Sequence, residues 1–181
     1  MTISSSSFSR YNLLCLLAVV GCLLPAFAFS HQSSVPFDVE FLDTMSQHHR
    51  EGIMMMEMAI EKTDNKKIGT DAQKMMGDQQ REIQAMQALK EEIMPGRPNS
   101  VNMKMPGMMA MDMEILKEKT GRDFDRAYLK HMIKHHQGAI KMSDHALQKA
   151  KNAEVRAMAQ RMHDQQKREI ADMKSTLQGM K

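Results

Sequence analysis

Two pairs of adjacent histidines are the residues whose types and spacing point most clearly to chemistry. His48-His49 and His135-His136 each follow a methionine, Met45 or Met132, that stands four residues before the second histidine. Residues four apart lie on the same face of a helix, so this methionine and histidine can hold a common ion. Thioether sulfur is a soft ligand and imidazole binds copper well, so the pattern favours Cu(I).

Further histidines and methionines near these pairs are also candidate ligands. They are His131, His145, Met54, Met55, Met58 and Met142. A single histidine is more often an ordinary half-buried residue, but two pairs in matching places favour metal binding. Neighbours in a helix point about 100° apart, so we expect one histidine of each pair to face the interior and the other the flank. If the two histidine-bearing helices are neighbours, two imidazoles and two thioethers converge.

Methionine is unusually abundant, with 22 residues against six phenylalanines and two tyrosines. We expect Met75, Met86, Met158 and Met173 to fill the core, because their spacing matches a buried helical stripe. Six others stand among proline, glycine and lysine, where we expect exposed thioethers that gather around a soft ion: Met103, Met105, Met108, Met109, Met111 and Met113. The run 54–58 covers every side of a helix, so some of its sulfur atoms must be exposed. The alternative is an adaptable surface that binds a partner protein.

The chain contains one internal repeat. An offset of 87 residues aligns Phe37-Asp38 with Phe124-Asp125, and the first histidine pair with the second, without a gap. At the same offset Glu82-Ile83 aligns with Glu169-Ile170. Agreement in a single register over so long a stretch indicates a duplicated two-helix unit.

Each repeat unit is predicted to be a helical hairpin, because apolar residues recur every three or four positions. The predicted helices run from Phe37 to about Thr63, from Lys66 to Ile93, from Thr120 to about Lys151, and from Asn152 to Leu177. Prolines and glycines exclude one continuous helix between residues 95 and 113, although the chain can turn helical from Met108 to about Lys119.

These helices predict an all-α protein, a four-helix bundle made from two duplicated hairpins. The first hairpin spans residues 29–94 and the second spans residues 120–181. A methionine-rich linker, residues 95–119, joins them into one bundle domain, 29–181.

Residues 1–28 have the layout of a signal peptide, with one base, an uncharged apolar run and small residues ending at Ala28. We therefore expect export to the periplasm and no membrane span in the mature chain. The sequence before Cys22 resembles a lipid-attachment site, but apolar residues continue after it, so anchoring there is the less favoured alternative. Both cysteines, Cys15 and Cys22, lie in this segment. The mature chain therefore offers soft sulfur only as thioether.

The sequence lacks the motifs of several enzyme classes. No histidine has a glutamate three residues before it, as a di-iron bundle requires, and no zincin, phosphate-loop or nucleophile-elbow motif occurs. Without cysteine, a blue-copper site is excluded and structural zinc is a weaker fit. A net charge of +3 is too small to indicate nucleic acid as the main partner. We expect a protein that is not an enzyme and binds no nucleic acid.

The run from Phe124 to Met142 resembles the signature of a secreted, ferritin-like bacterial family, number 305 among the domains of unknown function. Its residues here are Phe124, Asp125, Tyr128, Leu129, Met132, His135, His136, Gln137, Gly138, Ala139, Ile140 and Met142. With its methionine-rich linker the chain is similar to family members that bind copper in the periplasm and are linked to copper resistance. The resemblance implies binding of Cu(I), and of Ag(I) as a mimic.

The resemblance carries over to specific residues in both halves of the chain. In the second half they are Met132, His135, His136 and Met142, and in the first half Met45, His48, His49 and Met55. The first half departs from the signature, because Arg50-Glu51-Gly52 stands where the second half has Gln137-Gly138-Ala139. An arginine beside the histidines implies a weaker or differently shaped first site.

Two hypotheses follow from the sequence. The first is a periplasmic protein that binds Cu(I) through His/Met clusters, tolerates Cu(II) at histidine-rich sites, and serves copper resistance, buffering or transfer. Its partners would be copper ions and a copper exporter or sensor protein, and an exposed methionine face is compatible with a homo-oligomer. The alternative is a methionine-rich helical interaction or chaperone module without an essential metal.

Overall fold

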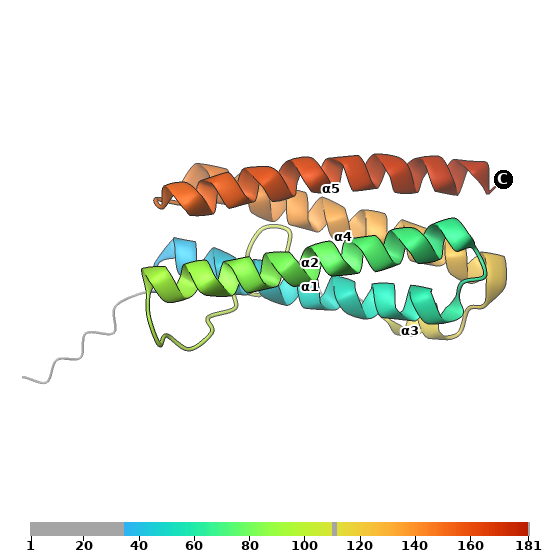
Figure 1. Ribbon diagram of the computed structural model, residues 1–181, viewed down its shortest axis with the longest axis horizontal. Coiled ribbons are helices and arrows are strands. Elements are labelled where there is room, and N and C mark those ends of the chain that lie inside the picture. Colours follow the sequence, from blue (N-terminus) through green and yellow to red (C-terminus); the bar gives the residue numbers. More distant parts are fainter. Residues whose placement is uncertain (1–34, 110–111, 181) are drawn as a thin grey trace, which may run out of the picture. The chain divides into compact units, whose positions relative to one another are not determined.

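The computed structural model describes residues 35–109 and 112–180 (Figure 1). The signal peptide expected at 1–28, with Cys22, and Met111 of the linker lie outside the described residues. The regular structure of the described chain consists of five helices: α1 (Phe37–Lys62), α2 (Lys66–Ile93), α3 (Glu114–Lys117), α4 (Gly121–Lys149) and α5 (Ala153–Gly179). Within this part of the chain, no helix combines the length and apolar character that crossing a bilayer requires.

Asparagine side chains begin the second helix of each hairpin. Asn65 accepts hydrogen bonds from the backbone N–H groups two and three residues further on, and Asn152 does the same 87 residues later. These bonds satisfy N–H groups that the first turn of a helix leaves without an intrahelical partner. The repeat is therefore present in the capping as well as in the sequence.

The long helices lie close to their predicted positions. α2 has the predicted bounds, α1 and α4 end one and two residues before the predicted positions, and α5 ends two residues later. The helix expected between Met108 and Lys119 is much shorter, because α3 spans four residues, Glu114–Lys117. The linker is therefore mostly irregular loop.

Two helical hairpins make up the fold. α1 packs against α2, α4 packs against α5, and α1 against α4 joins the hairpins. Figure 1 shows α2 and α5 running alongside each other, and residues of both helices line two cavities. The all-α architecture of paired hairpins is the one predicted.

Apolar side chains form two core clusters that lie toward opposite ends of the helices. One cluster contains Met45, from early in α1, and Met142, from late in α4. The other contains Met55, from late in α1, and Met132, from early in α4. α1 and α4 are therefore antiparallel, and the residues midway along them lie between the clusters. As expected, Met75, Met86, Met158 and Met173 are buried in these clusters.

The linker is held against α1 by polar contacts. Buried Lys90 donates hydrogen bonds to Asp43 (2.8 Å) and to Asn99 (2.6 Å), and the Ser100 backbone N–H donates to the second Asp43 oxygen. One methionine beyond this anchor, Met105, is only 2% exposed and lies in a core cluster. The expectation that all linker methionines are exposed is therefore wrong for Met105, because the loop folds back onto the bundle.

Candidate metal centre

A layer of buried polar side chains separates the two core clusters. Its centre is formed by His48, His49, His135 and His136, each with a relative exposure of 0%. In each pair one histidine, His49 or His136, does lie toward the second helix of its own hairpin, but it is fully buried there. A second helix covers the flank in each hairpin and supplies a carboxylate there.

One histidine of each pair binds a glutamate from the second helix of its own hairpin. His49 Nε2 lies 2.6 Å from a Glu82 carboxylate oxygen, and His136 Nε2 lies 2.9 Å from Glu169. A carboxylate accepts, so Nε2 carries the hydrogen and Nδ1 of a neutral ring keeps its lone pair. Among the described residues neither Nδ1 atom has a hydrogen-bond partner. Metal-ligating histidines commonly have this arrangement, with one nitrogen held by a carboxylate and the other free.

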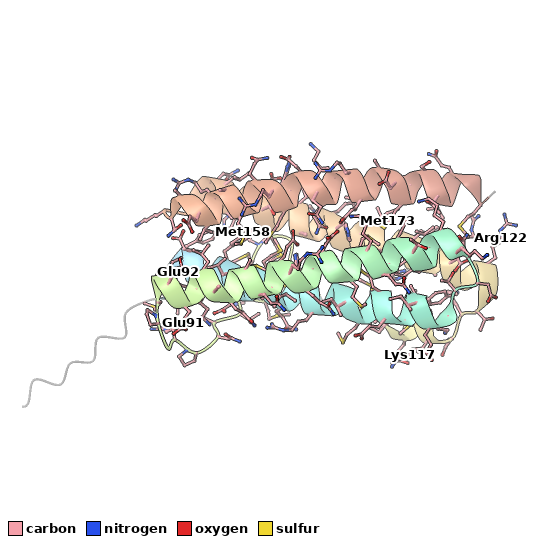
Figure 2. All side chains as sticks on the ribbon, viewed as in Figure 1. Glu91, Glu92, Lys117, Arg122, Met158 and Met173 are labelled. Carbon is pink, nitrogen blue, oxygen red and sulfur yellow. The ribbon has the colours of Figure 1, made fainter. Side chains whose placement is uncertain are left out.

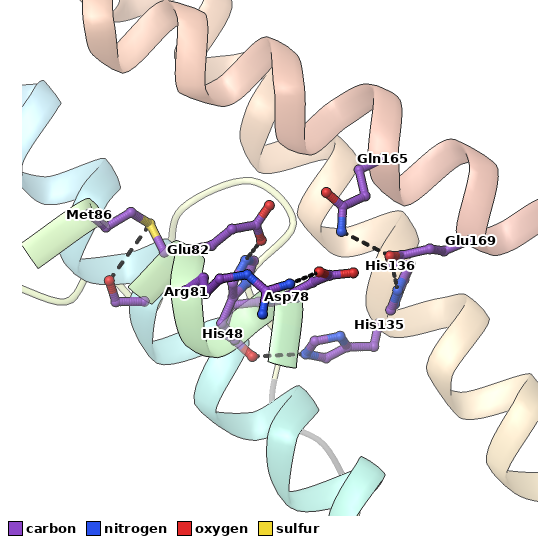
Figure 3. A network of polar contacts seen from close by, with 11 residues as sticks. His48, Asp78, Arg81, Glu82, Met86, His135, His136, Gln165 and Glu169 are labelled. Atoms are coloured by element: carbon purple, nitrogen blue, oxygen red, sulfur yellow. Dashed lines mark hydrogen bonds and ion pairs between the residues drawn. The ribbon is translucent and has the colours of Figure 1, made fainter. Parts of the chain in front are cut away.

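The other two histidines stack on each other where α1 meets α4. The His48 and His135 ring centroids are 3.8 Å apart, with planes inclined by 24°. His135 Nε2 donates to the backbone oxygen of His48 at 2.9 Å (Figure 3). Within the described chain, His135 Nδ1 and both ring nitrogens of His48 have no partner. The stack therefore offers further lone pairs in a buried place.

Burial keeps the stacked imidazoles neutral. Burial, with smaller contributions from the neighbouring histidines His49 and His136, lowers the pKa of His48 to about 3. Burial and the charge of His48 likewise lower the pKa of His135 well below its ordinary value. Neutral imidazole is the form that ligates a metal, so both rings are ready to bind at neutral pH.

The Glu169 carboxylate stays ionised despite its burial. Burial opposes ionisation, but the hydrogen bond and charge of His136, together with a hydrogen bond from Gln165, outweigh it and lower the pKa of Glu169. Figure 3 shows Gln165, Glu169 and His136 linked in this way. An ionised carboxylate raises the basicity of the imidazole that it holds.

Glycines let the backbone approach the layer closely. A Cβ atom on Gly52 would lie 2.7 Å from His135 Cε1, and one on Gly138 would lie 3.1 Å from His48 Nε2. The linker also reaches this place, since a Cβ on Gly138 would lie 2.5 Å from the backbone oxygen of Gly107. Gly107 itself has φ +99°, a conformation that favours glycine. The linker therefore closes over the His48 side of the layer.

Met45 and Met132, which were predicted to converge with the histidines, belong to different core clusters. Met45 lies in one core cluster with Met142, and Met132 lies in the other with Met55. All four thioethers are buried at 0% exposure. Because α1 and α4 are antiparallel, the two methionines that match in sequence lie on opposite sides of the histidine layer.

The remaining candidate ligands lie outside the histidine layer. Met54 and Met103 are exposed, at 48% and 56%, as expected for part of each run. Half-buried positions are occupied by Met58, Met108, Met109, Met113, His131 and His145. His131 bonds the backbone oxygen of Ala127 in its own helix, and His145 packs edge-on against Phe37.

Sequence reasoning missed the polar partners of the histidines. Glu82 and Glu169 hold His49 and His136, and the buried Gln79 and Gln166 stand three residues before them. All four recur at the offset of 87 residues, so the repeat itself carried the signal. Across residues 35–109 and 112–180, no three His, Cys, Asp or Glu side chains lie where they could together hold a metal ion. A metal would therefore need thioether ligands or a rearranged layer.

Comparison with known proteins places the chain in a family. DUF305, a domain of unknown function, matches twice in tandem, over residues 28–90 and 91–177. Curated proteins give no match. Among solved structures, a DUF305 protein from Streptomyces coelicolor, inferred to be secreted, is 25% identical, with a TM-score of 0.72 over 80% of this chain and 94% of that one.

CopM, solved in metal-bound forms, is also similar. Its Cu(I)-bound form is 29% identical, with a TM-score of 0.68 over 78% of this chain and 96% of CopM. Its Cu(II)-bound form is 30% identical, with a TM-score of 0.70 over 80% and 97%. CopM has an Ag-bound form as well. Because the tandem match takes in both hairpins, and the similar structures have the same fold, the chain belongs to the DUF305 family.

Proposed function

We propose that this chain is a periplasmic copper-binding protein that holds Cu(I), with Ag(I) as a redox-inert mimic, for copper resistance, buffering or transfer. It acts by binding and carries out no catalysis. The similarity to CopM, which binds Cu(I), Cu(II) and Ag, supports the class of ligand. The residues that bind it in this chain are argued from the geometry of the layer.

The observation that carries the proposal is the duplicated glutamate–histidine pair. Glu82 fixes the ring of His49, and Glu169 fixes that of His136, and in both cases Nδ1 remains without a partner among the described residues. A buried lone pair without a partner costs free energy that a bound ion recovers. Selection for stability alone would give these nitrogens a hydrogen bond.

Thioethers supply the softer part of the proposed ligand set. Met103 and Met54 are exposed, and the half-buried Met108 and Met109 stand beside Gly107, where the linker meets the histidine layer. Thioether ligands select Cu(I) over hard cations, whereas the imidazoles also accept Cu(II). Surface methionines would therefore capture the ion first, and the imidazoles would hold it.

The test is equilibrium dialysis against Cu(I) under reducing conditions. We expect the variant His49→Gln with His136→Gln to bind Cu(I) at least about tenfold more weakly, because each glutamine can still donate to its glutamate but offers no imidazole nitrogen. His163→Gln is the matched control, because His163 lies outside the layer and pairs with Asp144 and Asp164. Unchanged affinity and stoichiometry in the double variant would show that the layer is not the site.

The same dialysis distinguishes copper binding from the alternative, a methionine-rich interaction module. Exposed Met54 and Met103 would serve that function equally well. A protein that binds no Cu(I) at all, yet retains a protein partner in its absence, would favour the module and contradict copper binding.

A further inference from the structure

Two cavities between α2 and α5 are related by the internal repeat. The larger, of about 250 Å³, is lined by Glu82 from α2 and by Met158 and Met162 from α5. The smaller, of about 80 Å³, is lined by Met75 from α2 and by Glu169 and Met173 from α5. Glu82 and Glu169 stand 87 residues apart, as do Met75 and Met162. Figure 2 shows Met158 and Met173 at different points along the space between α2 and α5.

Each cavity leads to the buried histidine layer through its glutamate. Glu82 lines the larger cavity and holds His49, and Glu169 lines the smaller cavity and holds His136. The Glu82 side chain is 20% exposed and that of Glu169 is 12% exposed. These two carboxylates therefore connect the cavities with the fully buried imidazoles of His49 and His136.

The two cavities differ in charge. In the larger, Asp78 and Glu82 are balanced by Arg81 and Arg161. In the smaller, three carboxylates face a single ammonium group; the charged residues are Asp71, Glu169, Asp172 and Lys74. Asp71 also pairs with Lys67 at 2.7 Å. Among the residues that line the two cavities, carboxylates outnumber cations only in the smaller one, so its lining favours a cation more than the balanced lining of the larger one does.

A buried tyrosine adds a second asymmetry. The Tyr128 side chain is 1% exposed, and no described residue accepts or donates a hydrogen bond at its hydroxyl. Tyr128 belongs to the same core cluster as Met75 and Met173, which line the smaller cavity. Burial, together with the charges of Asp71 and Glu169, raises the pKa of Tyr128. The residue 87 positions earlier is Phe41, which has no hydroxyl. The core cluster that includes Met75 and Met173 therefore contains a buried hydroxyl that has no hydrogen-bond partner among the described residues, and the tyrosine that bears it is not repeated in the first hairpin.

We propose that the smaller cavity is a binding site for a soft monovalent cation, Cu(I) or Ag(I), held by the thioethers of Met75 and Met173 and by Glu169. The site rests on the proposed copper binding and specifies where an ion enters the layer, next to His136. Within the described residues no group of three hard ligands is placed to hold a metal, so thioethers must complete the set. Their softness selects Cu(I) or Ag(I) over hard divalent ions.

The experiment measures Ag(I) bound per chain by mass spectrometry of the metal after gel filtration, with any thiol alkylated beforehand. The protein is produced from the full-length chain. Met75→Leu with Met173→Leu is compared with a variant of the two methionines that line the larger cavity, Met158→Leu with Met162→Leu. Methionine-to-leucine changes nearly conserve volume, so both variants should fold, which circular dichroism checks. We expect the first variant to lose about one Ag(I) per chain and the second to bind as much as the wild type.

Three results would overturn the proposal. Equal binding by the first variant and the wild type would remove the cavity as a site while leaving copper binding intact. Equal losses of bound Ag(I) in both variants would show that the charge difference between the cavities does not decide where Ag(I) binds. A wild-type chain that binds no Ag(I) would defeat the proposed function together with this site.

A second variant pair tests the charges without touching the core. Asp71→Asn with Asp172→Asn should weaken Ag(I) binding at this site about fivefold or more at low salt, and less at high salt, where charges are screened. Asp164→Asn is the control and should leave Ag(I) affinity unchanged, because Asp164 lines neither cavity and contacts only Gln160 and His163 among the bonds described. No change in the double variant would contradict the role assigned to the acidic cavity.

Discussion

Acidification should destabilise the metal-free protein through the stacked histidines. The folded state keeps His48 neutral down to a pH of about 3, and burial also holds the pKa of His135 well below its ordinary value. In the unfolded chain both rings take up a proton near their ordinary pKa of about 6.5. Below that pH the unfolded state binds more protons than the folded state, so stability falls as the pH falls.

The size of this loss of stability follows from the pKa of His48 in the folded state, about 3, and its pKa in the unfolded chain, about 6.5. Between pH 7 and pH 5 the buried His48 imidazole should lower the free energy of unfolding by about 2 kcal/mol, and His135 should add a loss in the same direction. The loss should continue toward pH 3, where the folded state also begins to protonate His48. Because typical domains are stable by only about 5–15 kcal/mol, a change of this size is a large part of the total.

The assay is urea unfolding followed by circular dichroism, in EDTA, at pH 7 and pH 5. The variant His48→Gln with His135→Gln removes both titrating rings, so its own change between the two pH values should be smaller by at least about 2 kcal/mol. Comparing each protein with itself cancels any stability lost through the substitution. An identical pH dependence in variant and wild type would refute the reasoning, since the stack would then contribute nothing.

Three further predictions concern the linker and the helix starts. Gly138→Ala places a Cβ 2.5 Å from a linker carbonyl oxygen and should lower the free energy of unfolding by about 1–3 kcal/mol in urea denaturation. Gly77→Ala is its control, because that Cβ meets only a side-chain atom at 3.5 Å, and it should raise the free energy of unfolding slightly. Lys90→Met leaves buried Asp43 without its cation and should cost about 3 kcal/mol in the same assay. Asn152→Ala removes a helix cap and should cost about 1 kcal/mol in thermal unfolding.

The fold could be predicted from the sequence because local signals and the repeat agree. α2 has the predicted bounds, since Asn65 caps its start and Pro95 stands just after its end. An uninterrupted offset of 87 residues then fixed the architecture as two equivalent hairpins, and the tandem family match agrees. Helical period, capping and turn residues are properties of neighbouring positions, so the sequence displays them directly.

The layout of the candidate site depended on packing that the sequence does not display. Aligning the repeats places Met45 on Met132, but antiparallel packing puts Met142 in the same cluster as Met45 instead. The burial of both histidines in each pair depends on Glu82 and Glu169, which come from helices that cover the flank. Sequence periodicity shows which face of a helix is buried, but it does not show in which direction the neighbouring helix runs.

Two equivalent hairpins in antiparallel contact meet around an approximate twofold axis, and this explains which residues form a shared centre. Residues near the axis meet their own copies, so His48 stacks on His135. Residues further along α1 and α4 are kept apart, so Met45 and Met132 belong to separate clusters. Duplication therefore produced one common layer of imidazoles with two separate approaches. The linings of the two approaches have diverged, with Asp71 and Asp172 at one and Arg81 and Arg161 at the other.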